Sequence, residues 1–213
     1  MADACCAPPP LNLAPDRGNS TYRRILWIVL TINLAMFLVE IGAGVAAGSA
    51  SLQADALDFF GDAANYAISL MVVGMALRYR ATAALAKGAT VGLFGLWIMG
   101  TVFWHAVHGI LPSAMTMGVV GFVALLANGL SFGLLWAYRG ADANMRSAWI
   151  CTRNDVLGNL AVLLAALGVF GTQDGWPDIV VAAIMALLAL QGAAVVIRQS
   201  LTEMRQPIVA PAE

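Results

Sequence analysis

Runs of about twenty apolar residues recur along the whole chain, and they constrain its fold more than any other feature. About 20 helical residues, each rising 1.5 Å, cross the roughly 30 Å hydrocarbon core of a bilayer. Hydrophobic residues make up 61% of the 213 residues and charged residues only 11%, whereas about a quarter of the residues in soluble domains are charged. The sequence therefore predicts an all-α, polytopic membrane protein embedded in the lipid bilayer as a bundle of six transmembrane helices. The expected spans are about Ile25–Ala47, Leu57–Leu77, Ala89–Leu111, Ala114–Tyr138, Ala148–Phe170 and Ile179–Ile197.

The Lys and Arg residues set the expected orientation of the bundle. Three connections, around Gly48–Ala54, Pro112 and Thr172–Pro177, contain none of them. Because cytoplasmic loops carry the excess of Lys and Arg, we expect a multi-pass protein of the cell (inner) membrane with both termini in the cytoplasm. The basic residues on the expected cytoplasmic side are Arg17, Arg23, Arg24, Arg78, Arg80, Lys87, Arg139, Arg146, Arg198 and Arg205.

Composition divides the chain into three segments. Residues 1–22 are polar and rich in Pro, which predicts a flexible cytoplasmic tail. Residues 23–199 form the six-helix domain, and residues 200–213 form a short cytoplasmic tail. The formal net charge of −1 gives no indication of nucleic-acid binding. Cys5 and Cys6 could capture a soft metal ion, but without neighbouring His or acidic residues we favour a reduced, disordered tip.

The second expected span begins with carboxylates, which are costly inside a membrane. Asp58 and Asp62 are four residues apart and share a helix face, and Cys151 and Asp155 repeat this spacing in the fifth span. A charge at the bilayer centre costs about 2.5–3.5 kcal/mol on insertion scales, so such residues usually have a function. Counting 1.5 Å per residue from the expected helix ends places Asp62 and Asp155 at one level near the midplane. Three carboxylates and a thiol from two helices could there hold a divalent transition metal in a four-ligand site.

This set of donor atoms predicts a transported ion instead of a resident cofactor. Oxygen donors permit exchange, while the sulfur favours zinc, cadmium or cobalt over magnesium or calcium. A structural zinc site would contain more Cys and His. We therefore expect no permanently bound cofactor, and a secondary active transporter for Zn, Cd or Co instead of an enzyme.

Two regions of the chain carry a resemblance to a known family. From about Arg24 to Arg198 the chain resembles the transmembrane domain of the cation diffusion facilitators, which are six-helix proton-coupled exporters of zinc and related divalent metals. The segments with the resemblance are Asn33–Glu40 (NLAMFLVE), Gly48–Leu52, Asp55–Asp62, Asn144–Trp149 and Asp155–Asn159.

The resemblance implies a specific set of ligands. In that family the second helix carries His- or Asp-x-x-x-Asp and the fifth carries His-x-x-x-Asp, which by position implies Asp58, Asp62, Cys151 and Asp155. Asp55 falls outside the set, and we expect it at the entrance of the site. Cys151 stands where the family usually has His. The resemblance alone therefore does not imply that this chain has the family's metal preference or its proton coupling. We also expect a short form without the family's cytoplasmic metal-binding domain, in which a homodimer would rest on contacts between membrane helices.

The predicted ligands also have structural interpretations. Asp58 and Asp62 could form a structural ion pair with Arg153, but two carboxylates carry more negative charge than one guanidinium neutralises. Arg153 is expected to extend towards the cytoplasm or to balance the acids. A buried cysteine is usually a small hydrophobe, but the position of Cys151 one turn before Asp155 favours a ligand role.

Other polar residues lie outside the predicted ligand set. Glu40 and Asn33 are expected to be polar residues at helix contacts, and Glu40 could also belong to a proton path. His105 and His108, near the outer end of the third span, could assist metal release. An interfacial structural role beside Trp104 is the favoured interpretation for both histidines.

These features together predict metal export by proton-coupled alternating access through a site between the second and fifth helices. Two alternatives remain open. A non-transporting scaffold or regulatory homologue would keep the same fold. An intramembrane aspartyl protease also places acids on two helices, but its Tyr-Asp and Gly-x-Gly-Asp pattern is not matched around Asp62. Metal binding with proton release would separate the transporter from both.

Overall fold

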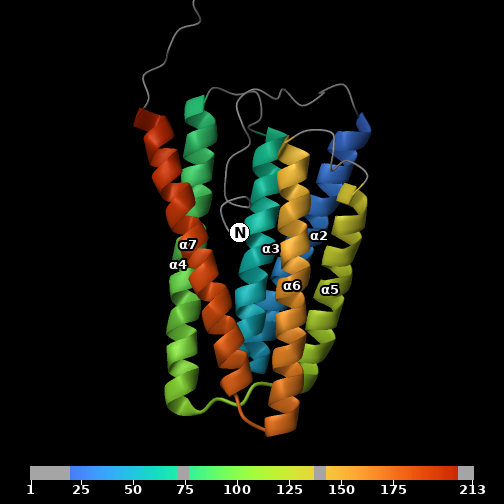
Figure 1. The fold of residues 1–213 in the computed structure, drawn as a ribbon, viewed down its shortest axis with the longest axis vertical. Helices are drawn as coiled ribbons and strands as arrows, with labels where there is room; N and C mark the ends of the chain where they lie inside the picture. The colour runs from blue at the N-terminus through green and yellow to red at the C-terminus, as the bar shows by residue number, and fades with distance from the viewer. Residues whose placement is uncertain (1–19, 72–76, 137–142, 206–213) are drawn as a thin grey trace, which may run out of the picture.

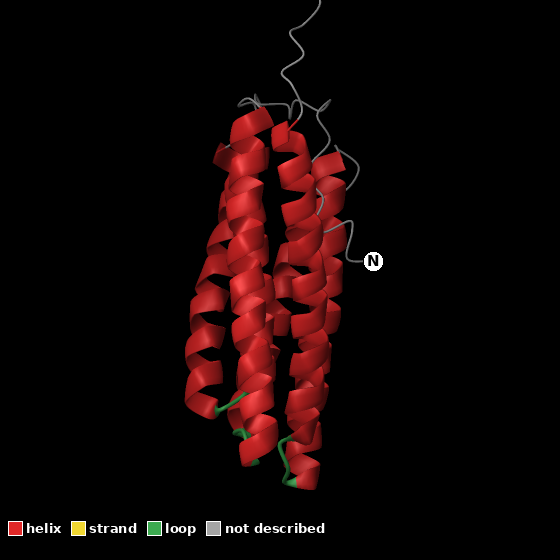
Figure 2. Ribbon diagram, turned by 90° about the vertical axis from the view of Figure 1, so that its left-hand side faces the viewer, coloured by secondary structure: helices red, strands yellow, loops and turns green. Residues whose placement is uncertain are grey.

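The computed structural model is a bundle of long helices, and the residues it describes contain no strand (Figure 2). It describes residues 20–71, 77–136 and 143–205, and the side chains of residues 20–22, 72–78, 80 and 143–153 are outside this description. The predicted all-α fold class is confirmed. The helices are α2 (Ser20–Ala47), α3 (Ala50–Met71), α4 (Leu77–His108), α5 (Ala114–Trp136), α6 (Ala143–Thr172) and α7 (Trp176–Arg205).

The outer surface of the bundle is suited to lipid. Large apolar side chains such as Leu93, Phe103 and Leu164 are 67–71% exposed, which would be unfavourable over so much surface in water. Within the described residues, all helices except α3 contain a segment long and apolar enough to cross a membrane. Helix α3, the exception, contains three Asp residues, Asp55, Asp58 and Asp62.

Helix α3 lies near the middle of the bundle (Figure 1). It packs against α2, α4, α6 and α7. Helices α4 and α7 form a closely packed pair on one side of it, while α5 packs against α6 and α2 on the other. A central helix can contain polar residues without exposing them to lipid. This position explains how α3 accommodates acids at membrane depth.

The short connections between helices gather at one end of the bundle, as the charge pattern predicts. Residues 48–49, 109–113 and 173–175 link consecutive helices at the lower end in Figure 1 and contain no Lys or Arg. The first turns of α2 and the last turns of α7 lie at the opposite end, where Arg23, Arg24, Arg198 and Arg205 are found.

The start of α3 differs from the sequence prediction. The sequence placed Gly48–Ala54 in a connection and began the second span at Leu57, but α3 begins at Ala50. Ser49 caps the helix, because its Oγ accepts a hydrogen bond from the Leu52 backbone N–H at 3.2 Å. Asp178 of α7 supplies a second cap by accepting the Ala50 N–H at 2.8 Å. These caps stabilise an earlier helix start than the apolar run alone indicates.

The start of α4 also differs from the prediction. The sequence placed Lys87 in a connection before a span that begins at Ala89, whereas α4 begins at Leu77 and contains Lys87 in its third turn. The intervening residues include Arg, Ala, Leu and Lys, which are strong helix formers. Intrinsic helix propensity therefore extends α4 beyond the membrane-length run.

Glycines in α4 allow it to approach α7 closely. A Cβ added at Gly88 would lie 3.0 Å from Val196 Cγ1, and one at Gly95 would lie 3.0 Å from Leu190 Cδ2. The spacing of Gly88, Gly92 and Gly95 predicts such close helix packing, and the structure confirms it.

Gly95→Val is expected to lower the free energy of unfolding by about 1–3 kcal/mol, because the added side chain would overpack the α4–α7 interface. Gly100→Val is the matched control, since a Cβ at Gly100 of the same helix would meet nothing within 4 Å. Unfolding of both variants in mixed detergent micelles measures the difference. Equal stability of the two variants would contradict close packing at Gly95.

Candidate metal-transport site

A cavity of about 440 Å³ lies between α3, α4, α6 and α7 and contains the predicted carboxylates. Asp58 and Asp62 reach it from α3, and Asp155 reaches it from α6. The other residues in its wall are mostly apolar or small, so the acids lie in surroundings of low polarity. The cavity wall consists of Leu57, Asp58, Gly61, Asp62, Asn65, Lys87, Gly88, Val91, Asn154, Asp155, Leu157, Gly158, Ala161, Ile184, Met185, Leu188, Ala189, Gly192, Ala193 and Val196.

Asp62 and Asp155 meet across this cavity. Their carboxyl groups interact directly, and Asp62 also interacts with the side chains of Asn65 and Tyr66. Asp62 is only 8% exposed. Helices α3 and α6 run in opposite directions in Figure 1, so residues far apart in the sequence come to the same level. The structure thus places Asp62 and Asp155 together, at the common level predicted from the helix rise.

Gly158 brings α6 close to the acids of α3. A Cβ added at Gly158 would lie 3.7 Å from Asp55 Oδ1 and 3.9 Å from Asp58 Oδ2. Both carboxyl groups therefore approach the α6 backbone within one turn of Asp155. A larger side chain at Gly158 would intrude on the space in which the acids of the two helices converge.

The described acids line one cavity but do not form a preformed metal cluster. Among the residues whose side chains are described, no group of three His, Cys, Asp or Glu is close enough to hold a metal ion. The fourth predicted ligand, Cys151, belongs to α6 one turn before Asp155, and its side chain is outside the described part. Mutual repulsion of carboxylates opposes tight convergence when no cation lies between them.

Sequence reasoning missed a cation in this cavity. Lys87 of α4 lines it, and its ammonium group donates a hydrogen bond to Asn65 Oδ1 of α3. Its positive charge also acts on Asp62. Its charge predicts a position in a cytoplasmic connection, whereas the structure places Lys87 on α4, where it lines the cavity that contains the acids. If the helix of the expected span at Ala89 is extended towards its N-terminus, it includes Lys87. The strong helix formers before Ala89 are the sequence signal that could have indicated this.

Asp55 and Glu40 lie beside the cavity, not in its wall. Asp55 is 1% exposed and Glu40 is 0% exposed, so Asp55 is not at an entrance as the sequence analysis expected. Asp55 Oδ2 accepts a hydrogen bond of 2.7 Å from Asn159 Nδ2, and Asn159 Oδ1 accepts one of 3.1 Å from Asn128 Nδ2. Asp55 therefore contacts α6 through Asn159 and α2 through Glu40.

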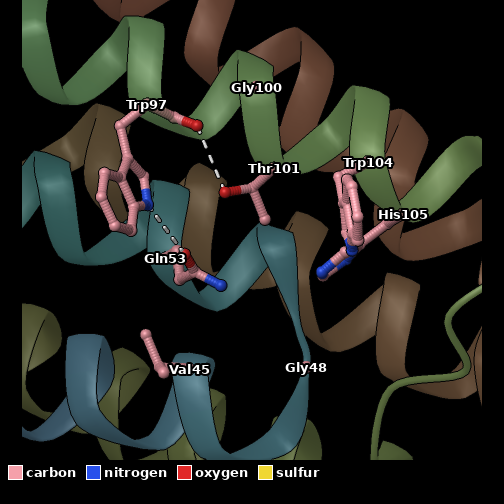
Figure 3. A pocket seen from close by; sticks show the side chains of 8 residues that line it. All are labelled: Val45, Gly48, Gln53, Trp97, Gly100, Thr101, Trp104 and His105. Atoms are coloured by element: carbon pink, nitrogen blue, oxygen red, sulfur yellow. Dashed lines mark hydrogen bonds between the residues drawn. The ribbon is translucent and has the colours of Figure 1, made fainter.

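The two histidines take different positions at the other end of α4. His105 is 8% exposed and lines a second cavity of about 440 Å³ that Trp97 and Trp104 also line (Figure 3). In this cavity Trp97 Nε1 donates a 3.4 Å hydrogen bond to Gln53 Oε1. His108 is exposed and stacks on Trp104 with ring centroids 3.7 Å apart. The two imidazoles therefore do not act on one cavity together.

Three other predicted accessory residues are outside the described part of the chain. Cys5 and Cys6 belong to residues 1–19, and the side chain of Arg153 falls in the undescribed portion of α6. Their predicted roles are therefore not addressed by the geometry.

The fold and the cavity define a polytopic membrane protein with buried acids at membrane depth, an arrangement typical of ion transport proteins. The chain belongs to the cation efflux family, because the family model described as the cation efflux transmembrane domain matches residues 26–204. This is a family of cation efflux proteins, which are transport proteins and not enzymes. The predicted family resemblance is confirmed.

Individual relatives are similar over most of this chain. The zinc transporter ZitB of Escherichia coli is 28% identical over 209 residues, which cover 89% of this chain and 64% of ZitB. The metal cation efflux system protein CzcD of Cupriavidus metallidurans is 24% identical, over 84% of this chain and 60% of CzcD. A Bacillus subtilis protein named as a cadmium, cobalt and zinc/H⁺–K⁺ antiporter is 23% identical, over 83% of this chain and 61% of that protein. The chain thus spans about three fifths of the length of these relatives.

Proposed function

We propose that the chain exports a divalent transition metal ion, Zn²⁺ first and Cd²⁺ or Co²⁺ also, through the cavity between α3 and α6. The contact between Asp62 and Asp155 carries this proposal, because it joins carboxylates of two antiparallel helices in a cavity that Asp58 also lines. Oxygen ligands at membrane depth suit a divalent cation that must both bind and leave. The choice of metals draws support from the names of the relatives, which refer to zinc, cadmium and cobalt.

The ion would be held by Asp58, Asp62, Cys151 and Asp155. Asp58 and Asp62 share a face of α3, and Cys151 precedes Asp155 by one turn of α6. A cation between the helices would offset the repulsion among the carboxylates and draw them together. The thiolate at position 151 would favour thiophilic ions, cadmium among them.

Protons would drive the export cycle. Carboxylates bind metal only when deprotonated, so binding releases protons and acidic conditions weaken binding. An inward-facing state would load metal from the cytoplasm, and an outward-facing state would take up protons that displace it. Lys87 would supply a resident positive charge next to Asp62 while the cation is absent, which lowers the cost of the buried acids.

The proposal includes an orientation and an assembly. Both termini of the chain would face the cytoplasm from the inner membrane, because the described terminal turns of α2 and α7 carry Arg residues and the connections at the opposite end of the bundle carry none. Residues 23–199 would be the transport domain; the predicted tails at 1–22 and 200–213 are shorter than expected, because α2 begins at Ser20 and α7 continues to Arg205. A homodimer would form through lipid-facing helix surfaces.

Purified protein is expected to bind Zn²⁺ saturably, with proton release and with an affinity that falls as pH falls. Titration calorimetry in two buffers of different ionisation enthalpy counts the protons released. Reconstitution in liposomes with a trapped metal indicator then measures flux of zinc, cadmium, cobalt, nickel, manganese and iron. Flux no faster than in protein-free liposomes for every metal would contradict the transporter and favour a scaffold.

A further inference from the structure

Glu40 of α2 and Asp55 of α3 form a contact between two carboxyl groups outside the proposed metal site. The two side chains interact directly, and they are 0% and 1% exposed. Neither lines the α3–α6 cavity. Two buried acids in contact are unusual, because an isolated buried charge is expensive and adjacent like charges increase that cost.

The hydrogen bonds around the pair are incomplete. Among the described residues, neither oxygen of Glu40 and only one oxygen of Asp55 receives a hydrogen bond from a donor. Ionised carboxylates only accept hydrogen bonds, whereas a protonated carboxyl group donates one. The contact between Glu40 and Asp55 therefore requires a proton between the two groups.

The neighbouring amides determine which carboxyl group carries that proton. Asn159 donates to Asp55 Oδ2, and Asn128 donates to Asn159 Oδ1, which fixes the orientation of the Asn159 amide. Asp55 thus already accepts one hydrogen bond from an amide donor. Glu40 lacks any such donor within the described part of the chain and so is the protonated partner, donating O–H to Asp55.

The charges that face Glu40 are few. Helix α2 packs against α3 and α5. From α3, Asp55 and Asp58 act on Glu40, while α5 contains no titratable residue. Helix α6 contributes the neutral amide of Asn159. Lys87 is hydrogen-bonded to Asn65 and acts on Asp62 instead.

We propose that Glu40 and Asp55 form a second cation site of this chain, a proton-binding site separate from the metal ligands. Asp58 lies one helical turn from Asp55, so a divalent cation at Asp58 would offset the negative charge that holds the proton on Glu40. The Glu40 O–H bond then breaks, the proton passes to water, and both carboxyl groups are ionised. Metal and proton thus compete through charge without sharing a ligand. This coupling rests on the proposed transport function, whereas the shared proton does not.

Infrared spectroscopy of the detergent-solubilised protein tests the proton directly. The wild type is expected to show the carbonyl stretch of a buried protonated carboxyl group, which shifts in D₂O. Glu40→Gln, which keeps the shape and supplies an N–H donor to Asp55, is expected to lose this band. Glu203→Gln on α7 is the matched control and should keep the band, because it removes an acid that accepts a hydrogen bond from Gln199 and has no contact with Glu40 or Asp55 among the described residues. Because Asp62 and Asp155 are a second pair of contacting carboxyl groups, the two proteins are compared by the wild-type minus Glu40→Gln difference spectrum. Absence of a protonated-carboxyl band from that difference spectrum would overturn the proposal.

Asp55→Asn provides a second variant in case Glu40→Gln folds poorly. The new amide would give Glu40 a donor, so Glu40 no longer needs a proton and the band should disappear here as well. An unchanged band in Asp55→Asn would also overturn the shared proton.

Flux in proteoliposomes tests the coupling. Glu40→Gln is expected to move metal down its own gradient but to lose the acceleration that a pH gradient gives the wild type. Unchanged acceleration would overturn the coupling role of Glu40. If the wild type moved no metal, the proposed transport function would fail, whereas the infrared result would still decide whether the pair holds a proton.

Discussion

Asp62→Asn and Asp155→Asn are each expected to abolish measurable metal transport while leaving the helical bundle folded. Loss of one carboxylate removes both a ligand and a negative charge from a site whose ligands come from two helices. Even partners outside the ligand set typically affect metal affinity by about 10–100-fold, so loss of a ligand should cost at least that much. Asn preserves the side-chain shape and keeps one acceptor oxygen, while an uncharged NH₂ donor replaces the other oxygen.

The measurement has two parts, which separate loss of function from loss of folding. Metal flux in proteoliposomes reports transport, and size-exclusion profiles with thermal unfolding report the folded state. Asp174→Asn is a matched control, because Asp174 is an exposed acid in the connection between α6 and α7 and does not line the cavity. Wild-type flux in either cavity variant would show that the ion does not pass between Asp62 and Asp155.

The class and order of the helices could be predicted from the sequence because each apolar run is long enough to cross a bilayer. The start of α3 could not be predicted in the same way. Its second cap comes from Asp178, which is 128 residues away from Ala50 in the sequence. Ser49 is a favoured N-cap residue and could have indicated the start of α3. A search for long apolar runs does not detect N-cap residues.

Some features of the candidate site could likewise be predicted from the sequence, and others could not. The spacing of Asp58 and Asp62 on one helix face and the helix rise were sufficient to predict that Asp62 meets Asp155. The orientation of neighbouring helices was not available from the sequence. For that reason Lys87 was assigned to a connection, and the amides of Asn65 and Asn159 were not recognised as partners of the acids. Helix rotation, which decides what faces the interior, depends on tertiary packing.

Asp178→Ala is expected to lower the free energy of unfolding by about 3 kcal/mol or more, the largest stability effect we expect at a single position. Asp178 is 1% exposed and ties α7 to the start of α3. Its oxygens accept hydrogen bonds from Ser49 Oγ at 2.7 Å and from Ser51 Oγ at 2.6 Å. They also accept the backbone N–H groups of Ala50 at 2.8 Å and Ser51 at 3.0 Å.

Removal of this carboxylate would leave two backbone N–H groups of the α3 N-terminus buried without a partner, at about 1–3 kcal/mol each. It would also remove the negative charge that favours a helix N-terminus. Asp178→Asn should be intermediate, since its amide oxygen can keep one of these hydrogen bonds. Asp174→Ala, in the exposed connection just before α7, should cost less, because the Trp176 backbone N–H that Asp174 Oδ1 accepts at 3.3 Å is at an exposed position where water can replace the carboxylate. Unfolding by increasing fractions of denaturing detergent gives the order of stability, and equal stability of Asp178→Ala and Asp174→Ala would contradict a role of Asp178 in joining α3 to α7.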